Sequence, residues 1–191
     1  MKNSFLNNNE LQKLKFKKIG KNVLISRFAQ FYDEEKIEIG NDVRIDDFCI
    51  LSGSIKIGSF VHISAFCALY GSKGIELCDF SGISARTTIY SASDDFSGNY
   101  MIGPMLPKKI TNVTGGKVTL KRFVQVGAGS VILPNLTIEE GTVTGAMTLV
   151  TKSLDSWGIY TGIPAKRLRN REKVVLNLLS DLNPMAKNLK P

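Results

Sequence analysis

The chain has 191 residues and a formal net charge of +8 at pH 7, and 43% of its residues are hydrophobic. These values are ordinary for one folded domain, and no apolar run reaches the roughly 18 residues that a membrane span needs. Because the N-terminus also lacks the apolar core of a signal peptide, we expect a cytoplasmic protein without membrane insertion. Three cysteines without a C-x-x-C pattern favour neither a disulfide framework nor a metal site.

Residues 1–18 form a polar N-terminal segment with a small apolar stripe, Leu11, Leu14 and Phe16, which is typical of one short helix. A basic cluster runs from Lys13 to Lys21. It is either a solvated surface or, as a weaker alternative, a nucleic-acid contact. No interleaved aromatic residues or binding motif accompany the charge, so we do not expect a nucleic-acid partner.

Aliphatic residues recur every six positions from Ile39 onward, and this period matches neither a helix nor an alternating strand. It is typical of a chain that turns a corner after each short strand, so that three hexads close one triangular coil and the coils stack. The repeating positions are Ile39, Ile45, Leu51, Ile57, Ile63, Leu69, Leu77, Ile83 and Ile89, then Leu120, Val126, Ile132, Ile138, Thr144 and Val150, with a looser set at Ile19, Ile25 and Phe31. The sequence therefore predicts an all-β solenoid over residues 19–169.

Small residues often follow the aliphatic position, and we attribute them to corners that need unusual backbone angles. A second small or β-branched set lies four positions after the aliphatic residue, where an inward side chain has little room. Cys49 and Cys67 belong to this second set, which predicts reduced packing residues.

Residues 90–117 break the repeat in a stretch rich in Gly, Pro, Ser and Asp. A loop of this length inside a compact domain is usually functional or disordered, and its aromatic residues favour the first. We expect an arm that packs on a neighbouring subunit. The solenoid resumes over residues 118–155, Gly158–Arg169 forms a closing turn, and residues 170–183 have a helical pattern followed by a loose tail to residue 191.

Hexads such as IGNDVR, IGSFVH and VGAGSV resemble those of the hexapeptide-repeat acyltransferases. The long excursion resembles the loop of galactoside and maltose O-acetyltransferases, and the ending GAMTLVTKSLDSWGIYTGIPAKRLRN is similar to their closing signature. The stretch IYSASDDFSGNY resembles acetyltransferases of surface-polysaccharide clusters. The resemblance implies a left-handed parallel β-helix, a homotrimer with active sites between subunits, acetyl-CoA as the acyl donor, and a sugar acceptor.

Acyl transfer to a hydroxyl needs a general base, and the histidine that the family carries early in the loop is replaced here by Asp94 or Asp95. Each aspartate is a base, a partner that orients His62 of a neighbouring subunit, or a turn-forming carboxylate. His62 is the only histidine of the chain. It is either a catalytic participant or an ordinary corner residue. By resemblance Ser64 faces the acceptor, and Tyr90 and Ser91 are further candidates for substrate binding.

The resemblance also assigns coenzyme contacts. Backbone amides at the small residues of two late coils bind pantetheine in the family, and these positions match Ala128 and Ala146, although corner packing explains small residues equally well. The positions after the last coil match Thr151, Lys152, Lys166 and Arg169, where clustered cations suit a phosphate.

These features predict an acetyl-CoA-dependent O-acetyltransferase acting on a sugar hydroxyl in surface polysaccharide biosynthesis. The alternative is an N-acetyltransferase acting on a nucleotide-linked amino sugar, because a neutral amine is already nucleophilic and tolerates the missing loop histidine. A non-catalytic scaffold is a third interpretation. A γ-type carbonic anhydrase needs three histidines, whereas this chain has one, so no metal is expected.

Overall fold

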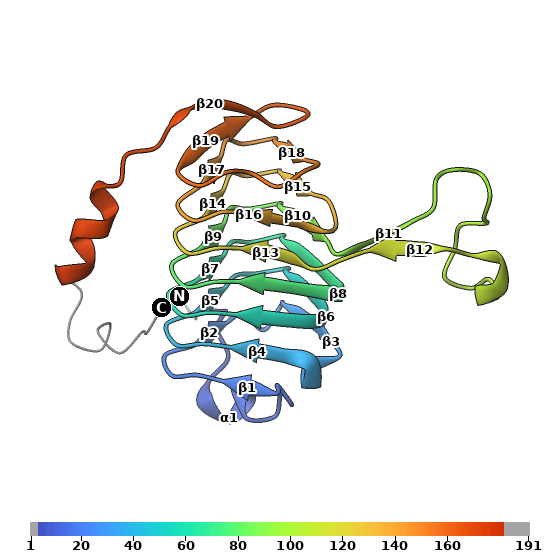
Figure 1. The fold of residues 1–191 in the computed structure, drawn as a ribbon. Helices are drawn as coiled ribbons and strands as arrows, with labels where there is room; N and C mark the ends of the chain where they lie inside the picture. Colours follow the sequence, from blue (N-terminus) through green and yellow to red (C-terminus); the bar gives the residue numbers. More distant parts are fainter. Residues whose placement is uncertain (1–3, 182–191) are drawn as a thin grey trace.

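Short parallel strands stack along the whole length of the molecule (Figure 1). The structure, a computed structural model, describes residues 4–181. One eight-stranded sheet is parallel throughout except for its last pair, which is antiparallel. In spatial order its strands are β2 (Leu24–Ile25), β5 (Arg44–Ile45), β7 (His62–Ile63), β9 (Gly82–Ile83), β14 (Gln125–Val126), β17 (Val143–Thr144), β19 (Gly158–Thr161) and β20 (Lys166–Asn170).

The other two faces of the solenoid are joined into one ten-stranded sheet, because β6 and β8 each continue around a corner. The start of β6 pairs with β3, whereas its end pairs with β4. The strands are β1 (Lys18–Ile19), β3 (Gln30–Tyr32), β4 (Ile37–Ile39), β6 (Ile50–Ile57), β8 (Ala68–Leu77), β10 (Thr88–Tyr90), β13 (Val118–Leu120), β15 (Val131–Ile132), β16 (Leu136–Ile138) and β18 (Leu149–Val150). The predicted β-solenoid is thus confirmed.

The six-residue repeat builds the core. From Ile39 to Val150, every residue of the predicted repeat is buried, including Thr144. Ile19 departs from this pattern and is 40% exposed, since β1 is the first strand of its sheet and has a neighbouring strand on one side only. Each coil buries its aliphatic side chains only against the coils beside it, so the stack is stable as a whole rather than coil by coil.

The corners differ from the sequence interpretation in their backbone geometry. The left-handed residues lie three positions after the aliphatic residue, and several are bulky, including Phe48, Phe66 and Phe80. Small residues directly after the aliphatic position have another cause. A Cβ on Gly127 would collide with the backbone of Gly145 on the next coil, so close approach of the coils, rather than backbone angle, requires glycine there.

The excursion forms an arm. Strands β11 (Ala92–Asp94) and β12 (Val113–Gly115) pair antiparallel and project from the body of the solenoid (Figure 1). Beyond them lie a short 3-10 turn, η2 (Lys108–Ile110), and several exposed apolar side chains. These are Phe96, Tyr100, Met101, Ile102 and Met105, and Val113 of β12 is exposed as well.

The two ends are closed by short elements. A helix, α1 (Asn8–Leu11), precedes β1, and a 3-10 turn, η1 (Glu34–Lys36), precedes β4. At the other end the expected closing turn is the β19–β20 hairpin, and the helical segment is a 3-10 helix, η3 (Val174–Asp181), that begins four residues later than predicted. Arg171 fastens this segment by donating to the carbonyls of Phe123 and Gly141 at 2.8 and 2.9 Å. Leu182 and the predicted tail lie outside the described residues.

Candidate functional site

The corner that follows β7, β9, β14 and β17 carries two parallel columns of residues. The first column, the serine–glycine column, consists of Ser64, Ser84, Gly127 and Gly145, each directly after a strand. The second column, the alanine column, consists of the next residues, Ala65, Ala85, Ala128 and Ala146. Backbone hydrogen bonds between successive coils, such as Met147 N–H to the Ala128 carbonyl at 2.8 Å, keep the columns in register. Two predicted coenzyme positions, Ala128 and Ala146, therefore lie one above the other.

The alanine column presents open backbone amides. Within residues 4–181, none of its four N–H groups donates to a recorded acceptor. At the corner after β1, β4 and β6, by contrast, side chains of the next coil cap the corresponding amides. Lys21 N–H donates to the Asn41 side chain, and Ser59 N–H donates to Asp79 at 2.7 Å. Alanine has no acceptor with which to cap a neighbour, so these amides remain available to a ligand with carbonyl oxygens.

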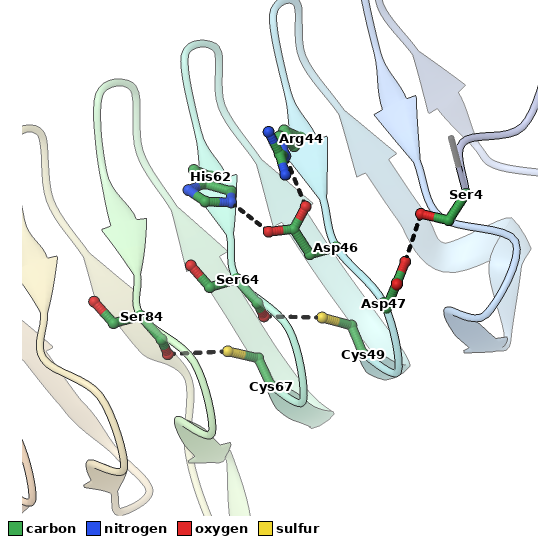
Figure 2. Close-up of polar contacts among 9 residues, drawn as sticks. All are labelled: Ser4, Arg44, Asp46, Asp47, Cys49, His62, Ser64, Cys67 and Ser84. Atoms are coloured by element: carbon green, nitrogen blue, oxygen red, sulfur yellow. Dashed lines mark hydrogen bonds and ion pairs between the residues drawn. The ribbon is translucent and has the colours of Figure 1, made fainter. Parts of the chain in front are cut away.

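His62 lies beside the serine–glycine column but pairs with a residue that the sequence did not suggest. Its Nε2 is 2.8 Å from Oδ2 of Asp46, whose other oxygen accepts from Arg44 Nε at 2.6 Å (Figure 2). The His62 side chain is 50% exposed. Among the described residues no recorded contact joins His62 to Asp94 or Asp95, so one chain by itself does not form the predicted pair.

Asp94 and Asp95 have different surroundings although they are neighbours. Asp95 accepts from Ser97 N–H at 2.7 Å and from the Asn112 side chain at 2.9 Å. Hydrogen bonds from Ser97, and then from Asn112, lower the pKa of this carboxyl. The geometry fits the turn-forming interpretation for Asp95. Asp94, at the end of β11, is half-buried, and its carboxylate has no recorded partner in the described part of the chain.

Tyr90 and Ser91 also differ from each other. Tyr90 is exposed and stacks on Tyr70 with ring centroids 5.3 Å apart. Ser91 is fully buried, donates to the Tyr70 carbonyl at 2.9 Å and accepts from Lys73 N–H at 2.8 Å. The structure thus gives Ser91 a structural position at the base of the arm rather than the expected contact with substrate.

Two of the four predicted phosphate contacts, Lys152 and Lys166, line one pocket at the C-terminal end. It has a volume of about 450 Å³ and brings Lys152 and Lys166 together with Arg167. Arg167 is occupied by Asn170 and Asp155, whereas no ion pair within residues 4–181 involves either lysine. Thr151 and Arg169 are exposed nearby but do not line this pocket.

Neither a metal site nor a membrane span is found in the described part of the molecule. No group of three or more His, Cys, Asp and Glu side chains there is arranged to hold a metal ion. No helix over residues 4–181 combines the length and the apolar character that crossing a bilayer requires.

No protein-family model matches the sequence. A dTDP-4-amino-4,6-dideoxy-D-glucose acyltransferase from Escherichia coli is 38% identical over 186 residues, which cover 96% of this chain and 97% of that protein. AntD, an N-acyltransferase from Bacillus cereus solved with dTDP and 3-hydroxybutyryl-CoA, is 51% identical with a TM-score of 0.92, over 94% of this chain and 96% of that one. A hexapeptide-repeat acetyltransferase from Vibrio cholerae, 18% identical with a TM-score of 0.60 over 88% and 83%, shares the fold.

Several AntD structures carry substitutions at two positions, S84A and D94N among them, and S84A was solved with dTDP-4-amino-4,6-dideoxyglucose and coenzyme A. This chain has a serine and an aspartate at the same two numbers, and Ser84 is exposed in the serine–glycine column. Ser84 is not among the site residues predicted from the sequence. The available signal was the polar residue at a corner position where glycine is common, one coil beyond Ser64.

Proposed function

This chain belongs to the sugar acyltransferases built on a left-handed hexapeptide-repeat β-helix, and from that premise we propose that it transfers an acyl group from acyl-coenzyme A to the amino group of a dTDP-linked 4-amino-4,6-dideoxy sugar. The observation that carries the proposal is the likeness over nearly the full length to proteins with this acceptor. It favours our N-acyl alternative over the O-acetyl expectation. The arm without a histidine agrees, because an amine needs less activation than a hydroxyl.

The chemistry assigns a role to Asp94. The lone pair of the sugar amine attacks the thioester carbon, a C–N bond forms, and the carbonyl oxygen becomes an oxyanion. When the C–S bond breaks, coenzyme A leaves as a thiolate. The nitrogen must lose one proton, which the unpartnered Asp94 carboxylate accepts and which the thiolate finally receives. Ser84, exposed on the corner, contacts the acceptor or the reacting carbonyl.

The coenzyme lies along the alanine column. The open N–H groups of Ala128 and Ala146 donate to the pantetheine carbonyls, and their small side chains let the arm approach the backbone. The phosphate end reaches the pocket with Lys152 and Lys166, whose ammonium groups form no ion pair within residues 4–181 and suit a phosphate dianion. Thr151 and Arg169 flank that end.

Asp94 reaches the corner with the serine–glycine column on a neighbouring copy of the chain. The arm projects from its own solenoid (Figure 1). It exposes apolar side chains, including Phe96 and Met105, which are 80% and 93% exposed. Exposed apolar area of this kind is typical of a protein interface. A homotrimer with three arms, each meeting the next solenoid, completes three sites. His62, Ser64 and Tyr90 are then candidates to line the acceptor side.

The test measures turnover with a panel of acceptors, and the readout is the release of the coenzyme A thiol. We expect transfer to a dTDP-4-amino-4,6-dideoxyhexose with acetyl-CoA or 3-hydroxybutyryl-CoA, and none to the 4-hydroxy sugar that matches it. Preference for the hydroxyl sugar would restore the O-acetyltransferase expectation. If the protein binds neither acyl-CoA nor the nucleotide sugar, the interpretation as a non-catalytic scaffold remains.

A further inference from the structure

A ladder of buried thiol and hydroxyl groups lies inside the solenoid, next to the serine–glycine column. Figure 2 shows its two thiols, each directed at a carbonyl of that column. Its members are Cys49, Cys67, Thr87, Ser130 and Thr148, and none is more than 1% exposed. Each member donates to the carbonyl of a residue in the serine–glycine column. From the sequence these positions are expected to be packing residues alone.

The distances show which group holds which carbonyl. Cys49 Sγ is 3.1 Å from the Ser64 oxygen, and Cys67 Sγ is 3.2 Å from the Ser84 oxygen. Thr87 Oγ1 lies 2.8 Å from the same Ser84 oxygen. A hydroxyl has one hydrogen, so Thr87 donates at this shorter distance rather than to Gly127 at 3.4 Å.

The coenzyme end follows the same pattern. Ser130 Oγ donates to the Gly127 oxygen at 2.7 Å, and Thr148 Oγ1 donates to the Gly145 oxygen at 2.8 Å. The four carbonyls of the serine–glycine column are therefore all directed inward, each onto at least one buried donor.

Another corner of the solenoid does without such a ladder. There the carbonyls of Cys78, Lys121 and Glu139 accept from backbone N–H groups three residues later, at 3.2 to 3.3 Å. The inward side chains at this corner include Val43, Val61 and Val124, which have no donor. Ser81 and Thr142 lie there too, but the Ser81 hydroxyl has no hydrogen-bond partner within residues 4–181, and the Thr142 hydroxyl donates to the Asp155 carbonyl instead. The fold itself therefore does not require a donor at this position, and the ladder at the serine–glycine corner needs another explanation.

Peptide geometry supplies one. In a trans peptide the C=O and the N–H point in opposite directions. The carbonyl of Ser84 and the N–H of Ala85 belong to one peptide unit, and the same holds for the Gly145 carbonyl and the Ala146 N–H. A donor that pins the carbonyl inward thus fixes the open amide outward, and it polarises that amide as hydrogen bonds in a chain do.

We propose that the buried ladder positions the outward amides that bind the acyl-coenzyme, with Thr87 and Cys67 setting the Ala85 amide for the oxyanion and Thr148 setting the Ala146 amide for pantetheine. The assignment of ligands rests on the proposed function. Thr87, Cys67 and Thr148 are positioning residues, because they touch the backbone of the corner and not the reactants. Preorganised donors of this kind matter most where charge develops in the transition state.

The experiment uses three threonines that are each at most 1% exposed, Thr87, Thr148 and Thr142. Substitution by valine removes the hydroxyl while keeping the shape of the side chain. Thr87→Val should lower kcat about tenfold with the acyl-CoA Kd within twofold, since only a transition-state donor has moved. Thr148→Val should raise the acyl-CoA Kd about fivefold, measured calorimetrically without acceptor, with kcat nearly unchanged.

Thr142→Val is the matched control, because Thr142 donates to the Asp155 carbonyl at 2.6 Å at another corner. It should lower Tm as the other two do, without either kinetic effect, and Thr87→Ser should restore kcat. The proposal would be overturned if all three valine variants lost the same Tm and showed the same kinetic effects. It would also be overturned if Thr87→Val and Thr148→Val both kept wild-type kinetics. If the wild type binds acyl-CoA but acylates no amino sugar, the proposed acceptor fails alone, and the Thr148 comparison by Kd still decides the ladder.

Discussion

At the scale of single residues, the structure separates two adjacent carboxylates that the sequence could not rank. Asp95 is bound to Ser97 and Asn112 and holds the base of the arm together, whereas the carboxylate of Asp94 remains without a partner in one described chain. A general base must keep an acceptor free for the substrate proton. This difference in hydrogen bonding, rather than position in the loop, selects Asp94.

Asp94→Asn should therefore lower kcat by about 100-fold or more, because a positioned base contributes on the order of 10² to 10⁴ in rate. Acyl-CoA binding should be unchanged, which calorimetry checks. The paired variant Asp95→Asn loosens the arm and should cost clearly less in kcat. His62→Ala should cost less than about tenfold. A loss of about 100-fold in His62→Ala, with activity retained in Asp94→Asn, would move the base to the imidazole.

Lys166 is tested by the ligand it is expected to bind. Lys166→Ala should raise the KM for acyl-CoA by about tenfold with little change in kcat, since an interaction present in both ground and transition states affects binding alone. The wild type should also bind dephospho-CoA more weakly than coenzyme A, and the variant should discriminate less. Equal affinity of the wild type for the two coenzymes would contradict a phosphate role for this pocket.

At the scale of secondary-structure elements, one carboxylate links the strand that follows the arm to two earlier strands of the same sheet. Glu76 of β8 contacts Lys117, next to β13, at 2.6 Å, and Lys56 of β6 at 3.0 Å. Hydrogen bonds with Lys117 and with Lys56 lower the pKa of Glu76. After the arm, the chain thus re-enters the solenoid at Lys117, which an ion pair holds to Glu76 of β8.

Glu76→Gln should destabilise the protein by about 1 kcal/mol at pH 7, as expected for a partly exposed ion-pair network. A depressed pKa stabilises the folded state only while the carboxylate is ionised. The contribution is therefore complete above the ordinary value of 4.5 and disappears as the pH falls through the lower pKa of the folded state. Denaturant unfolding measured over a series of pH values below 7 checks this, and a difference in stability that does not decline as the pH falls below 4.5 would contradict it.

At the scale of the whole molecule, the arm is the element that a single chain does not explain. Its apolar side chains, Phe96 and Met105 above all, are exposed, although a two-stranded ribbon is marginal without packing. The open amides and the arm lie on one chain but need a second copy to come together in the proposed site.

Replacement of residues 97–111 by a short Gly–Ser linker should shift the oligomer from trimer toward monomer, which sedimentation equilibrium measures. The replacement keeps β11 and β12, so the solenoid of each chain should stay intact. Coenzyme binding should then weaken only by the part that the neighbouring subunit contributes. Phe96→Ser serves as the smaller change and should weaken association in the same direction. A trimer that is unaffected by both changes would remove the arm from the interface.

The sequence by itself determined the solenoid, since a six-residue aliphatic period has few other structural solutions, and every repeat position from Ile39 to Val150 is buried. It also located the arm and the basic C-terminal end, because breaks in the period and clusters of charge are visible in one dimension. The corner backbone was assigned wrongly, since glycine next to the aliphatic residue reflects contact between coils rather than left-handed angles.

Only the tertiary structure decided how the site is built. The contacts of His62 with Asp46, of Ser91 with Tyr70 and of Cys67 with Ser84 each join residues on neighbouring coils. The repeat places these residues about one coil apart, but it does not show which of their polar atoms meet. The ladder and the open amides are properties of stacked peptide planes. A periodic sequence specifies that coils stack, but the direction of each peptide depends on which side chains meet after stacking.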